Sequence, residues 1–286
     1  MLNGIQKKIF VPDGTPVQEA LARTTHLAVS AHQDDTEIMA YDGISRCFGK
    51  NDSWFTAVIL TDGAGSPRSG PYRDHTDEQM RRIREQEQIK AAVVGGYSAL
   101  VMLGHPSSEV KDPSSTTVIS ELKEIIRAAK PQVIYTHNPA DRHMTHVAAA
   151  LRVIGALREL PDDLLPDKLY GCEVWRSLDW VCDKEKVVFD VSGHPNISAA
   201  LLGVFDSQIA GGKRYDLAAA GRRMANATFL EHDVADASDA LSFAIDLTPL
   251  VTDRSLDICG YVTAFIERFR QDVARNISIL SGVLRQ

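Results

Sequence analysis

The stretch that most constrains the fold is residues 27–37. A short apolar run, 27–31, is typical of a buried strand, and His32, Asp34 and Asp35 follow it just before a helical pattern begins. In α/β sheets, ligands bind at the carboxyl ends of the strands. His32 and Asp35 are spaced so that one nitrogen and one oxygen can reach a single metal ion, which leaves Asp34 free to act on water. The alternative interpretation is that the two acids only cap the following helix.

A second stretch repeats this arrangement. The strand-like run 133–135 leads into a polar loop that holds Asp141, His143 and His146, and a helical pattern follows. Two separate strand ends that carry metal-type side chains predict one shared site. This pairing favours the metal interpretation over simple helix capping.

Apolar runs alternate with helical patterns along most of the chain, which predicts βαβ units, a parallel sheet and right-handed crossovers. We expect a three-layer, Rossmann-like, mostly parallel sheet flanked by helices, with strands and helices added at the C-terminus. Residues 1–24 are interpreted as a lead-in. Strands are expected at 26–32, 54–60, 99–103, 133–135, 169–175, 187–191 and 243–247. Helices are expected at 35–48, 76–94, 115–129, 146–160, 196–209 and 215–230.

Composition narrows the class of protein. The chain has 286 residues, of which 44% are hydrophobic and 24% charged, and its net charge is −7. We expect a single domain, 1–286, with a motif-bearing core at about 25–210 and a C-terminal extension at 211–286. The acidic balance argues against nucleic acid or an anionic membrane as the main partner. No apolar run reaches the roughly 20 residues of a membrane span, and the N-terminus lacks a signal-peptide layout. Four cysteines without a Cys-x-x-Cys pair favour reduced thiols in a cytoplasmic protein.

Two further segments bear on function. The turn-rich loop 62–71 follows a strand end, where lids are often found, but it lacks the spacing and lysine of a P-loop, which disfavours nucleotide binding. An apolar stripe within 256–284 is interpreted as core or subunit interface rather than a ligand site. A homo-oligomer is therefore left open.

The two strand-end stretches together resemble the signatures of the PIG-L/LmbE-like family of zinc-dependent N-acetylglucosaminyl deacetylases. The first is similar to the family's Ala-His-Pro-Asp-Asp-x-Glu motif, and the second to its Pro-x-Asp-x-His-x-x-His motif. The resemblance covers roughly residues 25–210. It includes weaker elements at Thr61-Asp62-Gly63, Arg84-Glu85-Gln86-Glu87, Leu103-Gly104-His105-Pro106 and Ser207-Gln208. Gln33, in place of proline, departs from the pattern and affects the stiffness of the loop.

The resemblance implies a metal and its ligands. His32, Asp35 and His146 would hold Zn²⁺, since two nitrogens and one oxygen suit that ion. Iron(II) accepts the same set of ligands, so the sequence leaves the metal open. By the same resemblance, Asp34 is the general base that takes a proton from water.

His143 is implied to stabilise the oxyanion, as an imidazolium or as a hydrogen-bond donor. In many family members an aspartate precedes the last histidine and is a natural partner for this ring. Thr145 stands there in this chain. Asp141, or an acid from elsewhere in the fold, would therefore have to orient His143.

The resulting hypothesis is a zinc-dependent hydrolase that removes an acyl group, most simply acetyl, from the nitrogen of a small N-acylated amino sugar or its conjugate. Rival hypotheses are an amidase on a thiol conjugate or a glycopeptide sugar, and a catalytically silent sugar-binding protein. Candidate substrate contacts are Arg84, Arg68, Arg73 and Asp141, with Glu173 and Trp175 as a wall for sugar stacking. The remaining histidines are interpreted as surface or structural: His26, His75, His105, His137, His194 and His232.

Overall fold

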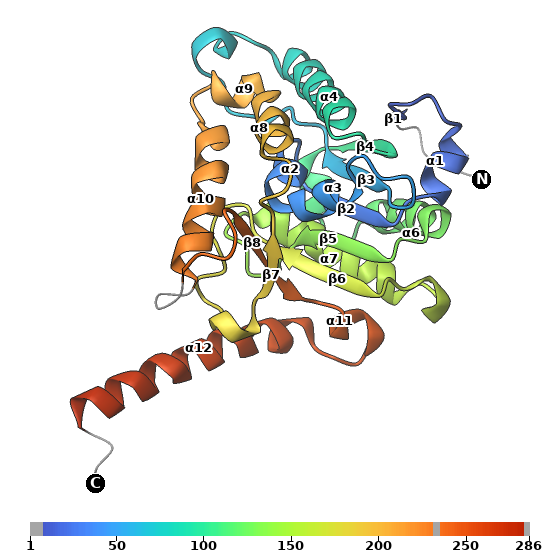
Figure 1. Cartoon of the computed structure of the whole chain (residues 1–286). Coiled ribbons are helices and arrows are strands. Elements are labelled where there is room, and N and C mark those ends of the chain that lie inside the picture. The colour runs from blue at the N-terminus through green and yellow to red at the C-terminus, as the bar shows by residue number, and fades with distance from the viewer. Residues whose placement is uncertain (1–7, 231–234, 283–286) are drawn as a thin grey trace.

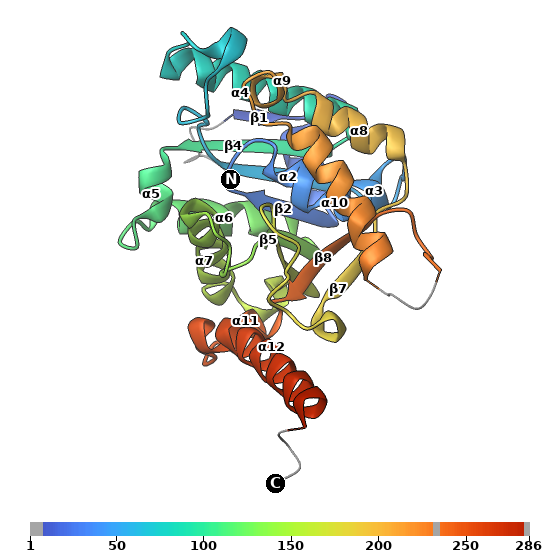
Figure 2. The same ribbon diagram turned by 90° about the vertical axis from the view of Figure 1, so that its left-hand side faces the viewer.

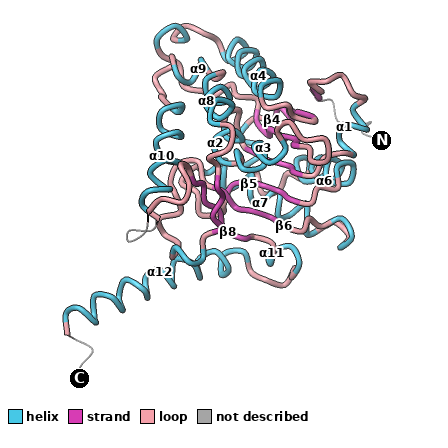
Figure 3. Tube along the Cα trace, in the orientation of Figure 1, coloured by secondary structure: helices cyan, strands magenta, loops and turns pink. Residues whose placement is uncertain are grey.

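The chain forms three layers, with a central sheet between two layers of helices (Figure 1, Figure 3). The structure is a computed structural model that describes residues 8–230 and 235–282. The strands are β1 (Lys8–Phe10), β2 (His26–Ser30), β3 (Phe55–Thr61), β4 (Ala99–His105), β5 (Val133–His137), β6 (Lys168–Cys172), β7 (Val187–Asp190) and β8 (Leu241–Asp246). Their order in the sheet is β1-β4-β3-β2-β5-β6-β8-β7. The five central strands β4, β3, β2, β5 and β6 are parallel, whereas β1 pairs antiparallel with β4, and β8 with both of its neighbours. The predicted mostly parallel α/β fold is confirmed.

Helices cover both faces of the sheet (Figure 2). They are α1 (Val17–Ala22), α2 (Asp35–Met39), α3 (Tyr41–Cys47), α4 (Asp77–Val94), α5 (Ser107–Lys111), α6 (Thr117–Ala129), α7 (Met144–Arg158), α8 (Pro195–Gly203), α9 (Asp206–Ile209), α10 (Tyr215–Phe229), α11 (Pro249–Thr252) and α12 (Ile258–Ser281). One core lies under α1, α6 and α7, and the other under α2, α3, α4 and α8. The wholly buried strand β3 shows why two cores form. Its alternate residues Val58 and Leu60 enter the first core, and Ala57 and Ile59 the second.

The order of the strands fixes where the loops meet. From β2 the chain moves outward through β3 to β4 and then returns to β5, which lies on the other side of β2. The loops that follow β2 and β5 therefore leave the sheet side by side, at the same carboxyl edge. This is the topological switch point, where α/β sheets bind ligands.

Several elements differ from the sequence-based prediction. The lead-in contains β1 and α1, and α5 was not predicted. The helix predicted at 35–48 breaks at Ala40, whose φ of −113° is not helical, and the one predicted at 196–209 breaks at Phe205, with ψ of 57°. The strand predicted at 169–175 ends at Cys172, which leaves Trp175 in a loop. His232 lies outside the described residues.

The last helix, α12, starts against the body of the protein and then extends away from it (Figure 1). Val262 and Phe265 are buried, whereas the same apolar stripe continues outward over partly or largely exposed residues: Ile266, Phe269, Val273, Ile277 and Leu280. The stripe thus belongs to the core only at its beginning. Among the described residues, no helix has the length and apolar character that a membrane crossing requires.

Candidate active site

Three side-chain atoms from the two strand ends form a small triangle. His32 Nδ1 lies 3.1 Å from Asp35 Oδ2, and His146 Nε2 lies 3.3 Å from each of these atoms. Ligands placed about 2.0–2.1 Å from a tetrahedral ion are roughly 3.3 Å apart. The triangle therefore has the dimensions of three ligands around one ion. A ring nitrogen of His143 lies within 4.8 Å of ring nitrogens of His32 and His146.

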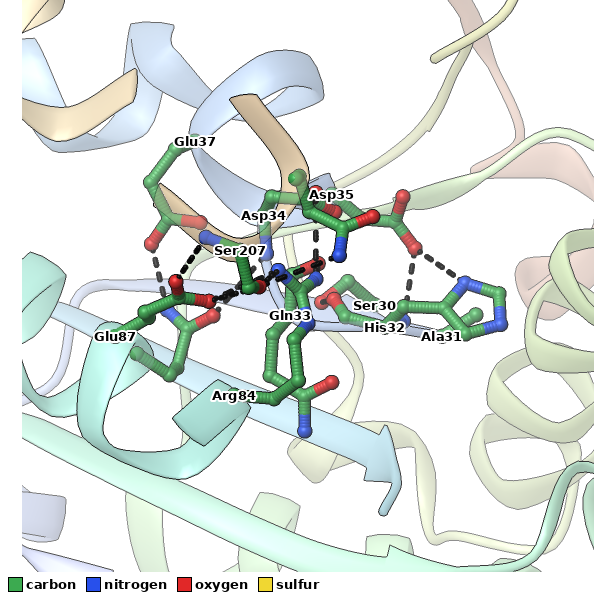
Figure 4. A network of polar contacts seen from close by, with 12 residues as sticks. Ser30, Ala31, His32, Gln33, Asp34, Asp35, Glu37, Arg84, Glu87 and Ser207 are labelled. Carbon is green, nitrogen blue, oxygen red and sulfur yellow. Dashed lines mark hydrogen bonds and ion pairs between the residues drawn. The ribbon is translucent and has the colours of Figure 1, made fainter. Parts of the chain in front are cut away.

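The backbone at the end of β2 separates two neighbouring carboxylates. Asp34 has a φ of 79°, an uncommon conformation that Asp tolerates better than most residues. Asp35 turns toward the histidines and accepts the His32 backbone N–H at 2.8 Å, whereas Asp34 Oδ2 lies 3.3 Å from Arg84 Nη2 (Figure 4). One carboxylate thus belongs to the triangle, and the other stays outside it beside the guanidinium group of Arg84.

Arg84 joins this turn to a buried network from α4 and α9 (Figure 4). Its side chain is only 2% exposed, donates to the Gln33 carbonyl and lies 3.2 Å from Glu87. Glu87 in turn accepts the Ser207 N–H at 2.6 Å and the Ser207 hydroxyl at 2.7 Å. Arg84 does line the cavity, as expected of a substrate contact, but its guanidinium group is largely occupied by protein.

A second buried network holds Asp34 through its backbone. The Asp34 N–H donates to Gln88 Oε1 at 3.3 Å, and Gln88 Nε2 donates to Glu37 at 2.7 Å. The Tyr97 hydroxyl donates to the same Glu37 oxygen at 2.7 Å. Burial raises the pKa of Glu37 to about 7 despite these donors. Glu37 therefore braces the turn.

Gln33, where the family pattern has proline, makes a contact that proline cannot. Its buried amide donates to the Thr61 carbonyl at 3.1 Å and so ties the end of β2 to the end of β3. Gly63 leaves room for this amide, because a Cβ there would lie 2.6 Å from Gln33 Oε1 and 3.0 Å from Arg84 Cβ. The Thr61-Asp62-Gly63 element thus packs against the turn.

At the end of β5, Asp141 contacts the ring of His146 rather than the ring of His143, its expected partner. Asp141 Oδ2 lies 3.2 Å from His146 Nδ1, while its Oδ1 accepts the backbone N–H of His143 at 2.8 Å. The hypothesis that Asp141 orients the His143 ring is not supported by these contacts. Within the described part of the chain, the buried Nδ1 of His143 has no hydrogen-bond partner. Asp141 is placed as a support for His146, since its own side chain is buried against that ring.

His137 was interpreted as a surface or structural residue, but it lies directly behind the triangle. It is fully buried, stacks on His146 with ring centroids 3.9 Å apart, and its Nε2 is 3.4 Å from Asp35 Oδ2. The same nitrogen accepts the Ala31 N–H at 2.9 Å, so it is already occupied. His137 therefore fits a bracing role. Its place as the last residue of β5 is the signal that could have identified it.

The electrostatics of the site favour a bound cation. Burial opposes a charge on His146, but Asp35 and Asp141 outweigh it and raise the pKa of His146 to about 10. Burial raises the pKa of Asp34 to about 6, although Arg84 opposes this. Burial and the neighbouring His146 and His32 lower the pKa of His143, which makes its neutral form the stable one at pH 7.

The triangle opens into a cavity of about 480 Å³. Asp34, His143 and Thr145 line it together with the triangle, and Trp175, Tyr215, Lys213 and Lys111 complete its walls. A larger cavity of about 800 Å³ lies between α10 and α12, but neither the triangle nor Asp34 or His143 lines it.

Besides Asp141, two arginines predicted as substrate contacts are absent from the lining of this cavity. Arg68 pairs with Asp77 and donates to the Ala64 and His75 carbonyls, so it stabilises its own loop. Arg73 is exposed outside the cavity. Glu173 is also not part of the lining and accepts the Leu178 N–H at 2.8 Å.

The fold and the site define an α/β protein with a candidate metal centre at the switch point of its sheet. Residues 27–157 match the profile of the PIG-L family, which is described as GlcNAc-PI de-N-acetylase. This match confirms the resemblance seen in the motifs of the chain. No curated protein sequence matches the chain.

Solved structures share the fold at low sequence identity. The conserved protein TT1542 from Thermus thermophilus is 18% identical, with a TM-score of 0.60 over 81% of this chain and 98% of its own. GalB, the 4-carboxy-2-hydroxymuconate hydratase from Pseudomonas putida, is 16% identical, with a TM-score of 0.60 over 78% and 95%. The N,N'-diacetylchitobiose deacetylase from Pyrococcus horikoshii is 14% identical, with a TM-score of 0.60 over 83% and 89%. A hydratase and a deacetylase thus share this fold, and the fold alone does not select the reaction.

Proposed function

We propose that the protein is a metal-dependent deacylase that removes an acyl group, most simply acetyl, from the nitrogen of an amino sugar or its conjugate. The observation that carries the proposal is the pairing of the metal-sized triangle with a separate carboxylate, Asp34, in the same cavity. The match of residues 27–157 to the PIG-L family profile and the likeness to the diacetylchitobiose deacetylase support the same reaction.

His32, Asp35 and His146 would hold the metal, and Zn²⁺ suits their two nitrogens and one oxygen, although Fe²⁺ accepts the same set. When bound, such an ion lowers the pKa of a water molecule and polarises a carbonyl group. Asp141 and the stacked His137 keep the His146 ring in position. These supports are typical of metal-binding histidines.

Asp34 would move the proton. Its ionised carboxylate accepts a proton from the attacking water and then delivers it to the amine nitrogen as the amide C–N bond breaks. Arg84, 3.3 Å away, favours the ionised form against the effect of burial. His143, as a neutral imidazole, would donate its N–H to the carbonyl oxygen as negative charge develops there. The products are a carboxylic acid and the free amine.

The substrate is proposed to be a small molecule, because the cavity of about 480 Å³ lies within the usual range for small-molecule sites. Aromatic walls at Trp175 and Tyr215 suit a sugar ring. A cytoplasmic location belongs to the same proposal and is supported by the four cysteines, all of which are free.

A direct assay tests the proposal. Purified protein, as isolated, after chelation, and after reloading with Zn²⁺ or Fe²⁺, is mixed with N-acetylated hexosamines, a glycopeptide sugar and an N-acetylated sugar linked to a thiol. Free amine and acetate are then measured. We expect equal amounts of both products from at least one sugar, loss on chelation and recovery on reloading. Sugar binding without release of amine under any metal would contradict the proposal and favour a silent binding protein.

A further inference from the structure

The helix α10, which follows the stretch matched by the family profile, connects two walls of the cavity. Its first residue, Tyr215, lines the cavity. Two turns further on, the adjacent residues Arg222 and Arg223 bind two different parts of the chain. The helix also packs on α8 and β8, which fixes its position relative to the sheet (Figure 1, Figure 2).

Arg222 binds three consecutive backbone carbonyls of the loop after β6. Its Nη1 donates to the carbonyls of Val174 and, at 3.3 Å, Arg176, and its Nη2 donates to that of Trp175 at 3.2 Å. A guanidinium group offers several donors in a rigid, planar arrangement, which a lysine ammonium cannot reproduce. Because Arg222 contacts three successive carbonyls, it fixes the backbone path of this loop rather than the position of a single residue.

Arg223 binds the end of α2. Its Nη2 donates to the carbonyls of Glu37 at 2.7 Å and Ile38 at 3.1 Å, and its Nη1 donates to the Ser198 hydroxyl at 2.6 Å. The first residue of α2 is Asp35, a member of the metal triangle. Through these two arginines, α10 fixes the position of the loop that carries Trp175 relative to α2, the helix that follows the Asp34 turn.

The loop held by Arg222 places Trp175 above the reaction centre. The Trp175 ring lies 6.5 Å from that of His143 at an interplanar angle of 19°, and 5.8 Å from that of Tyr215 at 78°. Both aromatic residues line the cavity, so they form a corner with two nearly perpendicular faces. The C–H face of a sugar ring is apolar and packs well against such a surface.

The partial burial of the Arg222 cation indicates that this residue is kept to fix the position of the loop after β6. Burying a cation is costly, and a well-packed apolar residue often serves stability better. Arg222 is nevertheless partly buried against carbonyl groups. A guanidinium group at this position contributes geometry that an apolar residue would not.

We propose that Arg222 is a positioning residue that holds Trp175 over His143, and that Trp175 and Tyr215 form the subsite for the sugar ring of the substrate. For the identity of the substrate, this proposal rests on the proposed function. The position of Trp175 can be measured without any substrate.

The test compares Arg222→Met, Arg222→Lys and Trp175→Leu with a control, Arg270→Met, which removes an exposed arginine of α12. KM and kcat are measured with the best N-acetylated sugar, together with metal content. Acrylamide quenching of Trp175 is obtained as the difference between each protein and its Trp175→Phe derivative. We expect Arg222→Met and Trp175→Leu to raise KM about tenfold with little change in kcat or metal, because a lost aromatic contact has this size. In Arg222→Met, Trp175 should also become more accessible to acrylamide, Arg222→Lys should be intermediate, and the control should match the wild type.

Unchanged KM and unchanged quenching in folded Arg222→Met would overturn the proposal. If Arg222→Met does not fold, Trp175→Leu decides, and an unchanged KM in that variant would overturn the sugar subsite. If the wild type hydrolyses no sugar, the proposed function fails. The quenching data, measured on Arg222→Lys if Arg222→Met does not fold, still show whether Arg222 positions Trp175.

Discussion

The ends of β2 and β5 contribute similar side chains to the site but are supported differently. The turn after β2 is held from behind by side chains of α4, with Arg84 and Gln88 contacting its backbone. The loop after β5 is held by its own residue Asp141 and by the strand residue His137. The residue proposed to move protons, Asp34, thus lies in the more heavily braced turn. His143, the residue proposed to donate to the substrate, lies at the start of the other loop's helix and lines the cavity.

This difference suggests a division of roles. A general base must stay at a fixed distance from its water while its charge changes, which favours a turn with many buried contacts. A donor to the substrate needs a free N–H that the substrate itself can engage. The following predictions test the two strand ends separately, from the largest expected effect to the smallest.

Removing a proposed ligand from either strand end should abolish metal binding. His32→Ala and His146→Ala each leave two of the three proposed ligands, so we expect loss of bound metal by elemental analysis and activity at background. His75→Ala, outside the cavity, is the control. Full metal occupancy in both ligand variants would show that the triangle is not the metal site.

Asp34→Asn should keep the metal and lose most of the activity. Asn tolerates a positive φ as Asp does, so the turn should persist. Loss of general-base catalysis typically costs about 10²–10⁴-fold in kcat. Steady-state kinetics and metal analysis on the same sample check this, and turnover near that of the wild type would falsify the role of Asp34.

His143→Ala should also keep the metal, with a rate lower by about 10²–10³-fold, the usual cost of removing one oxyanion donor. The loss should appear in kcat more than in KM, because the developing charge exists only in the transition state. A variant with normal kcat would mean that His143 is structural.

Asp141→Asn should weaken the metal site without removing it. Loss of such a supporting contact costs about 10–100-fold in metal affinity. We expect activity to recover when excess metal is added, in contrast to His146→Ala. Competition with a chelator measures the affinity, and an unchanged value would show that the Asp141–His146 contact does not support the metal.

The pH profile should have an acid limb and no alkaline limb from His143. Asp34 must be ionised to act, so the rate falls as pH decreases through its pKa, about tenfold per pH unit. Burial raises that pKa to about 6, and a bound cation would lower it, which places the limb at or below pH 6. The lowered pKa of His143 keeps this residue neutral above pH 7. A loss of rate between pH 7 and 9 that disappears in His143→Ala would instead support an imidazolium.

Much of the fold followed from local patterns in the sequence. Strand β3 is apolar on both faces, as expected for the interior of a parallel sheet, and the acids and histidines follow β2 and β5 directly. These features depend on neighbours in the chain, so their spacing is visible in the sequence. For the same reason the family resemblance could be recognised, and His32, Asp34, Asp35 and His146 could be proposed as one group.

The supports of the site were decided by tertiary structure alone. Glu87 and Ser207 meet across 120 positions of the chain, and Arg222 reaches the carbonyl of Trp175 across 47. The sequence suggested Asp141, or an acid from elsewhere in the fold, as the partner of His143, whereas Asp141 contacts the His146 ring. It also left His137 out of the site. Orientation within a loop depends on packing rather than on spacing. Sequence periodicity reports which face of an element is buried. It does not report which buried polar groups will meet, because that depends on how the layers close on each other.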